Sequence, residues 1–175
     1  MQLAGAMLAV AVLFAPVTQQ YPGAEWNKKS TLSTDRPVEF PGIVLQPGVY
    51  VIKLRDGGDR RSFVQILNQD ETQVLATIIA VPDHRLRPEG DSEFVFHEMK
   101  TPGPVPVQTW FYSGDLVGLE FVYPKPRAQQ IARETADHVM ASNNDKDGAI
   151  VAVTPNGKEV LIDGVPSAMA RRKPQ

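Results

Sequence analysis

Apolar and polar residues alternate with a period of two over much of the chain between about residues 30 and 123. Segment Val49–Leu54 has this pattern, with Tyr50, Ile52 and Leu54 on one face. Successive side chains of a β-strand point to opposite faces of a sheet, so this period predicts strands with one buried face. Pro-Gly dipeptides close to these runs predict turns at the ends of very short strands. The central part of the chain is therefore predicted to be mostly β.

Segment Thr109–Lys125, TWFYSGDLVGLEFVYPK, predicts a β-hairpin. Trp110 and Tyr112 share one face of the first apolar run, and the glycine and aspartate residues between the two runs suit a turn. The apolar face of the second run comprises Leu119, Phe121 and Tyr123. Glu120 lies on the opposite face, which we expect to point outward. This hairpin holds much of the aromatic mass of the chain, so we expect the rest of the fold to be organised around it.

Two further signals locate strands. Thr72–Pro82 is apolar almost without interruption and rich in β-branched side chains, which is typical of a central strand covered on both faces. A buried helix is the alternative for that segment. Asn156 and Gly157 stand between two β-prone runs, and an Asn-Gly pair in that setting predicts a hairpin. A lone hairpin is marginally stable in water, so the sequence leaves open whether this one packs on the body of the chain.

The period changes after Pro124. Apolar residues then recur at the spacing of one helix face, at Ala128, Ile131, Ala132, Thr135, Ala136, Val139 and Met140. Pro126 suits the first turn of a helix. We predict a single amphipathic helix over residues 125–141, lying shallowly against the sheets because its apolar stripe is narrow and rich in alanine.

Together these elements predict a mainly β fold: an antiparallel β-sandwich, immunoglobulin-like or prealbumin-like, with one C-terminal amphipathic helix. The predicted organisation begins with a signal-like apolar segment at residues 1–20 and a linker at residues 21–29. The sandwich domain is expected at residues 30–124 and the helix at residues 125–141. A polar loop, a β-hairpin and a flexible tail are expected at residues 142–175.

The N-terminal segment Leu3–Val17 carries no charge. As a helix it would cover only about 22 Å, which is less than the roughly 30 Å of a bilayer core. A secretory signal sequence therefore fits better than a membrane span, although no Lys or Arg precedes the apolar run. A buried N-terminal helix is the alternative. We expect an exported protein, periplasmic or extracellular, that meets a membrane only if this segment stays uncleaved.

Composition narrows the chemistry. The net charge of −2 gives no electrostatic reason to expect nucleic acid as a partner. The chain has no cysteine, which excludes disulfides, thiolate catalysis and cysteine-ligated metal centres. His84, His97 and His138 show no paired metal-ligand spacing, so we predict no metal and no cofactor. Asn143–Gly148 matches the opening of a calcium loop, but Thr154 stands where such a loop needs a bidentate glutamate.

Candidate binding residues come from two places. The polar connection Asp83–Ser92 follows a predicted strand, and binding loops tend to lie at strand ends. Its candidates are Asp83, His84, Arg85 and Arg87. In the hairpin, Trp110 and Tyr112 are candidates for stacking on sugar rings or gripping a peptide if they are exposed. The competing interpretations are a solvated, salt-bridged loop and a hydrophobic core.

The hairpin sequence WFYSGDLVGLEFVYPK, together with VYVIKL, FVQILN, ATIIAVPDHRLRP and PGIVLQPG, resembles a group of uncharacterised exported proteins of environmental bacteria. Their shared hairpin pattern is W-F-Y-x-G-D-x-x-G-x-E-F-V-Y-P-K, and the likeness covers about residues 38–133. The resemblance implies export and a common β-domain, and it implies no activity. The stretch PGIVLQPGVYV is also similar to strands of prealbumin-like and immunoglobulin-like modules.

No nucleophile elbow, phosphate-binding loop or dinucleotide-binding motif is present, so we predict no catalytic residue. The leading hypothesis is a non-catalytic binding or interaction module whose partner is a protein or glycan of the cell envelope. A second hypothesis is a hydrolase that uses the loop Asp83–Arg87 with Glu98 or Asp115 nearby. A third is a structural subunit that assembles through strand edges.

Overall fold

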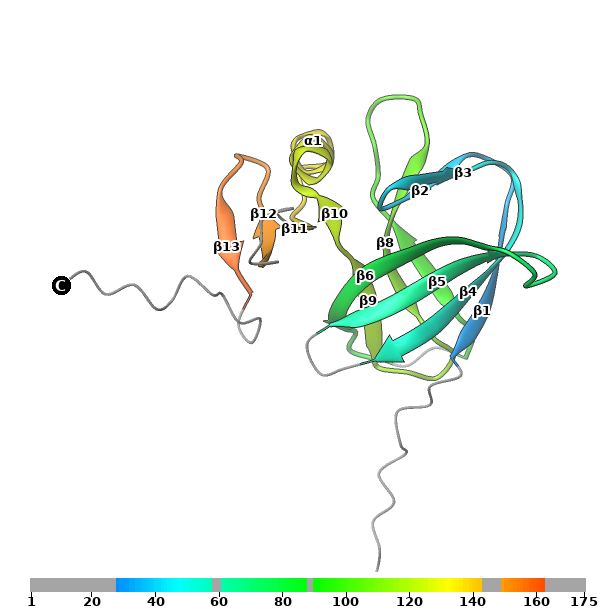
Figure 1. Ribbon diagram of the computed structural model, residues 1–175. Helices are drawn as coiled ribbons and strands as arrows, with labels where there is room; N and C mark the ends of the chain where they lie inside the picture. The colour runs from blue at the N-terminus through cyan, green and yellow to red at the C-terminus, as the bar shows by residue number, and fades with distance from the viewer. Residues whose placement is uncertain (1–27, 58–60, 88–89, 143–148, 163–175) are drawn as a thin grey trace, which may run out of the picture.

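The computed structural model describes residues 28–57, 61–87, 90–142 and 149–162. These residues form a mainly β fold with one helix (Figure 1), as the sequence predicts. In chain order the described elements are β1 (Lys29–Thr34), β2 (Val38–Phe40), β3 (Ile43–Leu45), β4 (Gly48–Gly57), β5 (Ser62–Asn68), β6 (Val74–His84), β7 (Glu93–Phe96), β8 (Val105–Phe111), β9 (Val117–Phe121), β10 (Tyr123–Pro124), α1 (Lys125–Thr135), β11 (Val139–Ser142), β12 (Ile150–Val153) and β13 (Glu159–Leu161). The predicted signal segment, the calcium-like loop at residues 143–148 and the tail from residue 163 lie outside the described residues.

The described strands belong to two sheets. The larger sheet has the order β1-β4-β5-β6-β9-β8-β2-β3, with β7 also paired to β8. The smaller sheet has the order β10-β11-β12-β13. Figure 1 shows that the larger sheet curves strongly, while the smaller sheet and α1 lie to one side of it. The larger sheet does not close, because β1 and β3 are its two end strands.

Both sheets are mixed, so the prediction of a purely antiparallel arrangement is too narrow. Among the described pairs, β2 runs parallel to β8 and β10 runs parallel to β11, whereas the others are antiparallel. Parallel neighbours need a crossover connection, and α1 is that connection between β10 and β11. A period of two is the same in parallel and antiparallel strands, which is why the pattern along the chain could not tell them apart.

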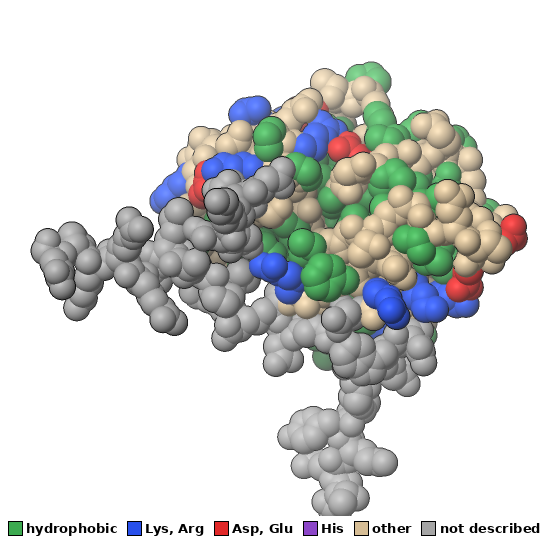
Figure 2. All heavy atoms as spheres, in the orientation of Figure 1, with side chains coloured by type: hydrophobic (Ala, Val, Ile, Leu, Met, Phe, Trp, Pro, Cys, Tyr) green, Lys and Arg blue, Asp and Glu red, His purple; other side chains and the backbone are tan. Residues whose placement is uncertain are grey.

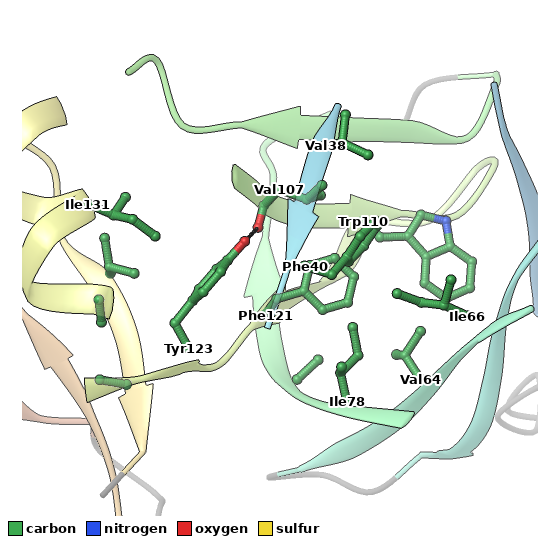
Figure 3. Close-up of a cluster of buried hydrophobic side chains, with 14 of the residues drawn as sticks. Val38, Phe40, Val64, Ile66, Ile78, Val107, Trp110, Phe121, Tyr123 and Ile131 are labelled. Carbon is green, nitrogen blue, oxygen red and sulfur yellow. Dashed lines mark hydrogen bonds between the residues drawn. The ribbon is translucent and has the colours of Figure 1, made fainter. Parts of the chain in front are cut away.

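One hydrophobic core fills the inside of the curved sheet (Figure 3). Figure 3 shows the side chains that point into this interior from β2, β5, β6, β8 and β9, among them Phe40, Val64, Ile66, Ile78, Trp110 and Phe121. The rings of Phe40 and Phe121 pack edge to face with centres 5.1 Å apart. The aromatic residues of β2, β8 and β9 therefore pack against the aliphatic residues of β5 and β6 across a common interior.

Both predicted hairpins are present. β8 and β9 pair antiparallel through Thr109 and Glu120. β12 and β13 pair antiparallel across the turn at Asn156 and Gly157, where Gly157 has a φ of 79°. β6 is confirmed as a central strand, because it pairs with β5 on one side and with β9 on the other.

The helix is shorter than the stripe of apolar residues predicts. It ends at Thr135, and Ala136 adopts the left-handed conformation with its N–H bonded to the carbonyl oxygen of Ala132. Val139 and Met140, which fit the helical stripe, lie on β11 instead. There they pair with β12, and the neighbouring strand on the other side is β10. Within the described residues, no helix is long and apolar enough to cross a membrane.

The smaller sheet packs on the outer face of β6, which answers the question that the sequence leaves open about the C-terminal hairpin. A second apolar cluster joins Val81, Val122 and Ile150, with Ile79, Met140 and Ile162 packed against it. Ile78 and Ala80 of the same strand face the main core. The predicted coverage of this strand on both faces is therefore confirmed for the part of β6 around residues 78–81.

Polar contacts also tie α1 to the larger sheet. The guanidinium of Arg127 donates from Nε and Nη2 to the two carboxylate oxygens of Glu39 on β2, at 2.8 and 2.6 Å. The hydroxyl of Tyr123 lies 2.9 Å from the carbonyl oxygen of Glu39 and 2.8 Å from that of Val107 (Figure 3). A bidentate Arg–carboxylate pair fixes orientation as well as distance. The helix is thus held against β2 and the start of β8.

Candidate functional site

Arg85 is largely buried and bonds to its own neighbours, although its Nη2 has no hydrogen-bond partner among the described residues. Its side chain is 11% exposed. Its Nε donates to the carbonyl oxygen of Asp115 at 2.8 Å, and its Nη1 donates to Oε2 of Glu93 at 3.1 Å. The guanidinium lies over the ring of Phe111, 4.7 Å from the ring centre. The ring has room there because position 118 is glycine, where a Cβ atom would lie 2.5 Å from the ring.

The other candidates of this connection point in different directions. The hydroxyl of Thr109 donates to Oδ2 of Asp83 at 3.1 Å, so Asp83 faces β8. The side chains of His84 and Arg87 are exposed, and Leu86 between them is fully exposed. Asp83 and His84 are also the last residues of β6 and not part of a loop. The four predicted residues are therefore not gathered into one site.

The carboxylates of the hydrolase hypothesis lie near opposite ends of β8. Asp115 follows the end of β8 at Phe111, and its backbone carbonyl oxygen accepts the hydrogen bond from Nε of Arg85. Glu98 follows His97, whose N–H bonds to the carbonyl oxygen of Pro106 near the start of β8. A strand rises about 3.3 Å per residue, so roughly 16 Å separates the two ends. Of the two carboxylates, Asp115 therefore lies beside the Asp83–Arg87 segment, whereas Glu98 lies near the other end of β8.

Trp110 is part of the core. It is 1% exposed, its Nε1 donates to the hydroxyl of Ser30 at 3.0 Å, and its ring stacks on that of Phe94 with centres 6.3 Å apart. Tyr112 is half-buried and meets Trp110 edge to face at 6.4 Å. Lys28 lies over the Tyr112 ring, 5.8 Å from its centre. The interpretation of these aromatic residues as core, which the sequence leaves open, is the one that the geometry supports.

Glu120 is buried, although the alternation in β9 predicts an outward position. It is 5% exposed and lies opposite Thr109 of β8 and Val81 of β6. Burial raises the pKa of Glu120 to about 8, and the nearby carboxylates of Asp83 and Asp137 raise it too. At neutral pH this carboxyl group is therefore largely protonated. It faces outward from the larger sheet as predicted, but the smaller sheet covers this face at Val81.

His97 is a second buried titratable group. It is 3% exposed, and its ring meets that of Tyr123 at 6.4 Å between centres. Burial lowers the pKa of His97 to about 4, against the opposing effect of Asp137. His97 is therefore a neutral packing residue at physiological pH. Among the residues that the structure describes, no group of three or more His, Asp or Glu side chains is placed to hold a metal ion.

A groove lies at the open side of the larger sheet, where the sequence indicates no site. Its volume is about 340 Å³. It is lined from the end of β1, the β1–β2 connection, β2, the end of β7 and the start of β8, by Leu32, Ser33, Thr34, Asp35, Arg36, Val38, Phe96 and Val105. The apolar members come from four different strands, and the polar ones come from the end of β1 and the turn that follows. The groove thus combines an apolar floor with a polar rim.

Phe96 is the aromatic residue of this groove. It is 36% exposed, whereas Phe94, two residues earlier on β7, packs against the core. A bulge in β8 shifts the register, so that Val95 pairs with Thr109 and Phe96 with Val107. After the bulge, Phe96 is the last residue of β7. Its side chain lines the groove, whereas that of Phe94 packs against the core. The sequence shows two phenylalanines on one face of a short strand and gives no sign that one of them is exposed.

No protein-family model, curated protein or solved structure matches this chain. The groove therefore has to be interpreted from its own residues. They include no reactive constellation, and the groove is lined by apolar and polar side chains in equal number.

Proposed function

We propose that this protein is an exported, non-catalytic β-sandwich module of the bacterial envelope that binds a protein or glycan in the groove beside Phe96. The observation that carries the proposal is a groove of about 340 Å³ with an aromatic side chain 36% exposed at its wall. Ligand sites are concave and combine apolar side chains with polar groups that fix orientation, and both kinds of side chain line this groove.

The sandwich arrangement, immunoglobulin-like or prealbumin-like, is supported by how the core is built. Ile52 of β4 and Ile66 of β5 lie in the same cluster as Phe40 of β2 and Trp110 of β8. One half of the curved sheet therefore packs its inner face against the other half, as two layers of a sandwich do. The groove then lies at an edge between the layers, where both layers contribute side chains.

Binding at the groove is expected to depend on Phe96. Phe96→Ser removes the aromatic wall and is expected to weaken ligand capture about tenfold or more, because aromatic anchors dominate binding energy. Phe63→Ser is the matched control: Phe63 is also a strand phenylalanine and is 38% exposed, but it lies on β5 away from the groove. The outer face over β4 and β5 is visible in Figure 2, where hydrophobic side chains are interspersed with polar ones.

The ligand can be sought with a glycan array and a phage-displayed library of random peptides, each probed with the wild-type protein and both variants. We expect capture that Phe96→Ser loses and Phe63→Ser keeps. Equal effects of the two variants would place binding elsewhere. No capture from either collection would count against a binding function at this groove.

Export is supported by the apolar segment Leu3–Val17 and by the resemblance of the hairpin to exported proteins. We expect the full-length chain, tagged at its C-terminus and expressed in a Gram-negative host, to fractionate with the periplasm. Deletion of residues 1–18 should keep it in the cytoplasm. The same distribution with and without these residues would contradict export.

A further inference from the structure

The outer edge of β1 faces the groove with free pairing positions. Among the described strands, β1 pairs with β4 alone. The N–H of Leu54 donates to the carbonyl oxygen of Lys28 at 2.9 Å, which fixes the phase of this antiparallel ladder. In such a ladder, hydrogen-bonded pairs alternate with non-hydrogen-bonded pairs. The backbone groups of Ser30 and Leu32 therefore point toward β4, and those of Thr31 and Ser33 point away from it.

β7 lies on the other side of this edge. The hydroxyl of Ser30 donates to that of Ser92, just before β7, at 2.7 Å. Farther along, Ser33 and Thr34 of β1 and Phe96 of β7 line the same groove. In the described pairing β7 is bonded to β8 and not to β1. Two strand edges thus meet through side chains at one end and border the groove at the other.

The direction of the strands decides what could lie between them. Each step from β1 through β4, β5, β6, β9 and β8 to β7 is antiparallel, so β1 and β7 run in the same direction. A single extended segment running the opposite way could pair with β1 as an antiparallel strand. Exposed strand edges are templates for such pairing, and several peptide-binding domains use them in this way.

We infer that the groove binds an extended peptide, which adds to the outer edge of β1 through the backbone groups of Thr31 and Ser33. This inference rests on the proposed function and names its partner. Alternate side chains of the peptide would lie on the apolar floor formed by Leu32, Val38, Phe96 and Val105. Asp35 and Arg36 form an exposed ion pair 3.5 Å apart, with side chains 91% and 69% exposed, and so place both signs of charge at one end of the groove. The partner is therefore a peptide with apolar residues at every second position and charged residues beside them.

A glycan fits the same groove less well. Sugar recognition commonly uses stacking on exposed aromatic rings together with several polar side chains, and the groove offers a single aromatic ring, that of Phe96. On the outer edge of β1, every second residue presents a backbone N–H donor and a C=O acceptor. This repeat matches the backbone groups of another β-strand. Backbone pairing gives affinity for any extended chain, and the floor would select among sequences.

Ser33→Pro separates strand addition from other modes of binding. Proline removes the N–H that points away from β4 and leaves the β1–β4 hydrogen bonds in place, since proline is tolerated on the free side of an edge strand. A synthetic peptide selected from the phage library, labelled with a fluorophore, serves as the probe. We expect Ser33→Pro to weaken its binding about tenfold or more in fluorescence polarisation, while the control Phe63→Ser, on β5 away from the groove, keeps the wild-type affinity.

Amide hydrogen exchange on the wild-type protein measures directly whether the peptide pairs with the outer edge of β1. The amides of Ser30 and Leu32 should exchange slowly with or without peptide, because they already bond to β4. The amides of Thr31 and Ser33 should exchange quickly in the free protein and slowly in the complex. This measurement keeps the inference testable even if Ser33→Pro fails to fold.

The outcomes separate the inference from the proposed function. Peptide binding that Phe96→Ser abolishes and a folded Ser33→Pro leaves intact would overturn strand addition and keep the groove as the site. If a glycan is captured in a way that depends on Phe96 and no peptide is selected, the inference of a peptide partner would be wrong and the proposed binding function would remain. If neither Phe96→Ser nor Ser33→Pro changed the binding of any probe, the proposed function at the groove and the inference of strand addition would both be wrong.

Discussion

Trp110→Ala is expected to lower the free energy of unfolding by about 4 kcal/mol, as truncation of a large buried aromatic side chain does. Trp110 is 1% exposed and stacks on Phe94 in the middle of the core. The substitution leaves a cavity that its neighbours on several strands can fill only in part. It also removes the indole donor that the hydroxyl of Ser30 accepts. Urea denaturation followed by circular dichroism measures the loss.

Phe63→Ala is the control for this result. Phe63 is also an aromatic residue of a strand, but it is 38% exposed, so we expect its truncation to cost about 1 kcal/mol or less. Equal losses from the two variants, or a loss below about 1 kcal/mol for Trp110→Ala, would show that Trp110 does not anchor this interior.

Raising the pH from 6.5 to 8 is expected to lower the free energy of unfolding by about 2 kcal/mol through Glu120. Burial, with a further effect from Asp83 and Asp137, raises the pKa of this carboxyl group from 4.5 to about 8. In this range the unfolded chain has already lost the proton that the folded chain keeps. The folded state therefore binds more protons than the unfolded state, and stability falls as the pH rises through the range.

His97 acts in the opposite direction at lower pH. Burial lowers its pKa from 6.5 to about 4, so the unfolded chain takes up a proton that the folded chain does not. This contribution to stability is present above pH 6.5 and is lost as the pH falls toward 4. Between pH 4.5 and 6.5 the slopes of Glu120 and His97 oppose each other. The range from pH 6.5 to 8 is therefore where Glu120 can be observed with only a small opposing change at His97.

Glu120→Gln tests this assignment. Glutamine has nearly the same shape and cannot ionise, so the variant should lose the decline between pH 6.5 and 8 and should exceed the wild type in stability at pH 8. Glu71→Gln is the control, because Glu71 is exposed and pairs with Lys29 at the surface, so this variant should keep the wild-type slope. Urea denaturation at a series of pH values measures the profile. A slope that survives Glu120→Gln would mean that other groups titrate in this range.

Part of the site could have been found in the sequence, and part could not. The sequence points to the end of β6 and to the aromatic hairpin because these places hold reactive or aromatic side chains. The structure uses Arg85 and Trp110 for packing and internal hydrogen bonds. The groove is lined mainly by residue types that are common in any strand or turn, and Phe96 is exposed only through its place at the end of β7. No local sequence pattern predicts a groove that is lined by such common residues.

Local physical chemistry determined the mainly β class, the hairpins at β8–β9 and β12–β13, and the central place of β6. Turn residues and the alternation of side chains act over a few neighbouring residues, so turns and strands can be recognised from the sequence alone. Tertiary structure decided that Val139 and Met140 join a strand, that β2 runs parallel to β8, that Glu120 is buried, and that β1 is an end strand among the described strands, beside a groove. Each of these features depends on which distant segment packs against the residue or strand in question. The hydrophobic pattern of one segment does not identify the segment that packs against it.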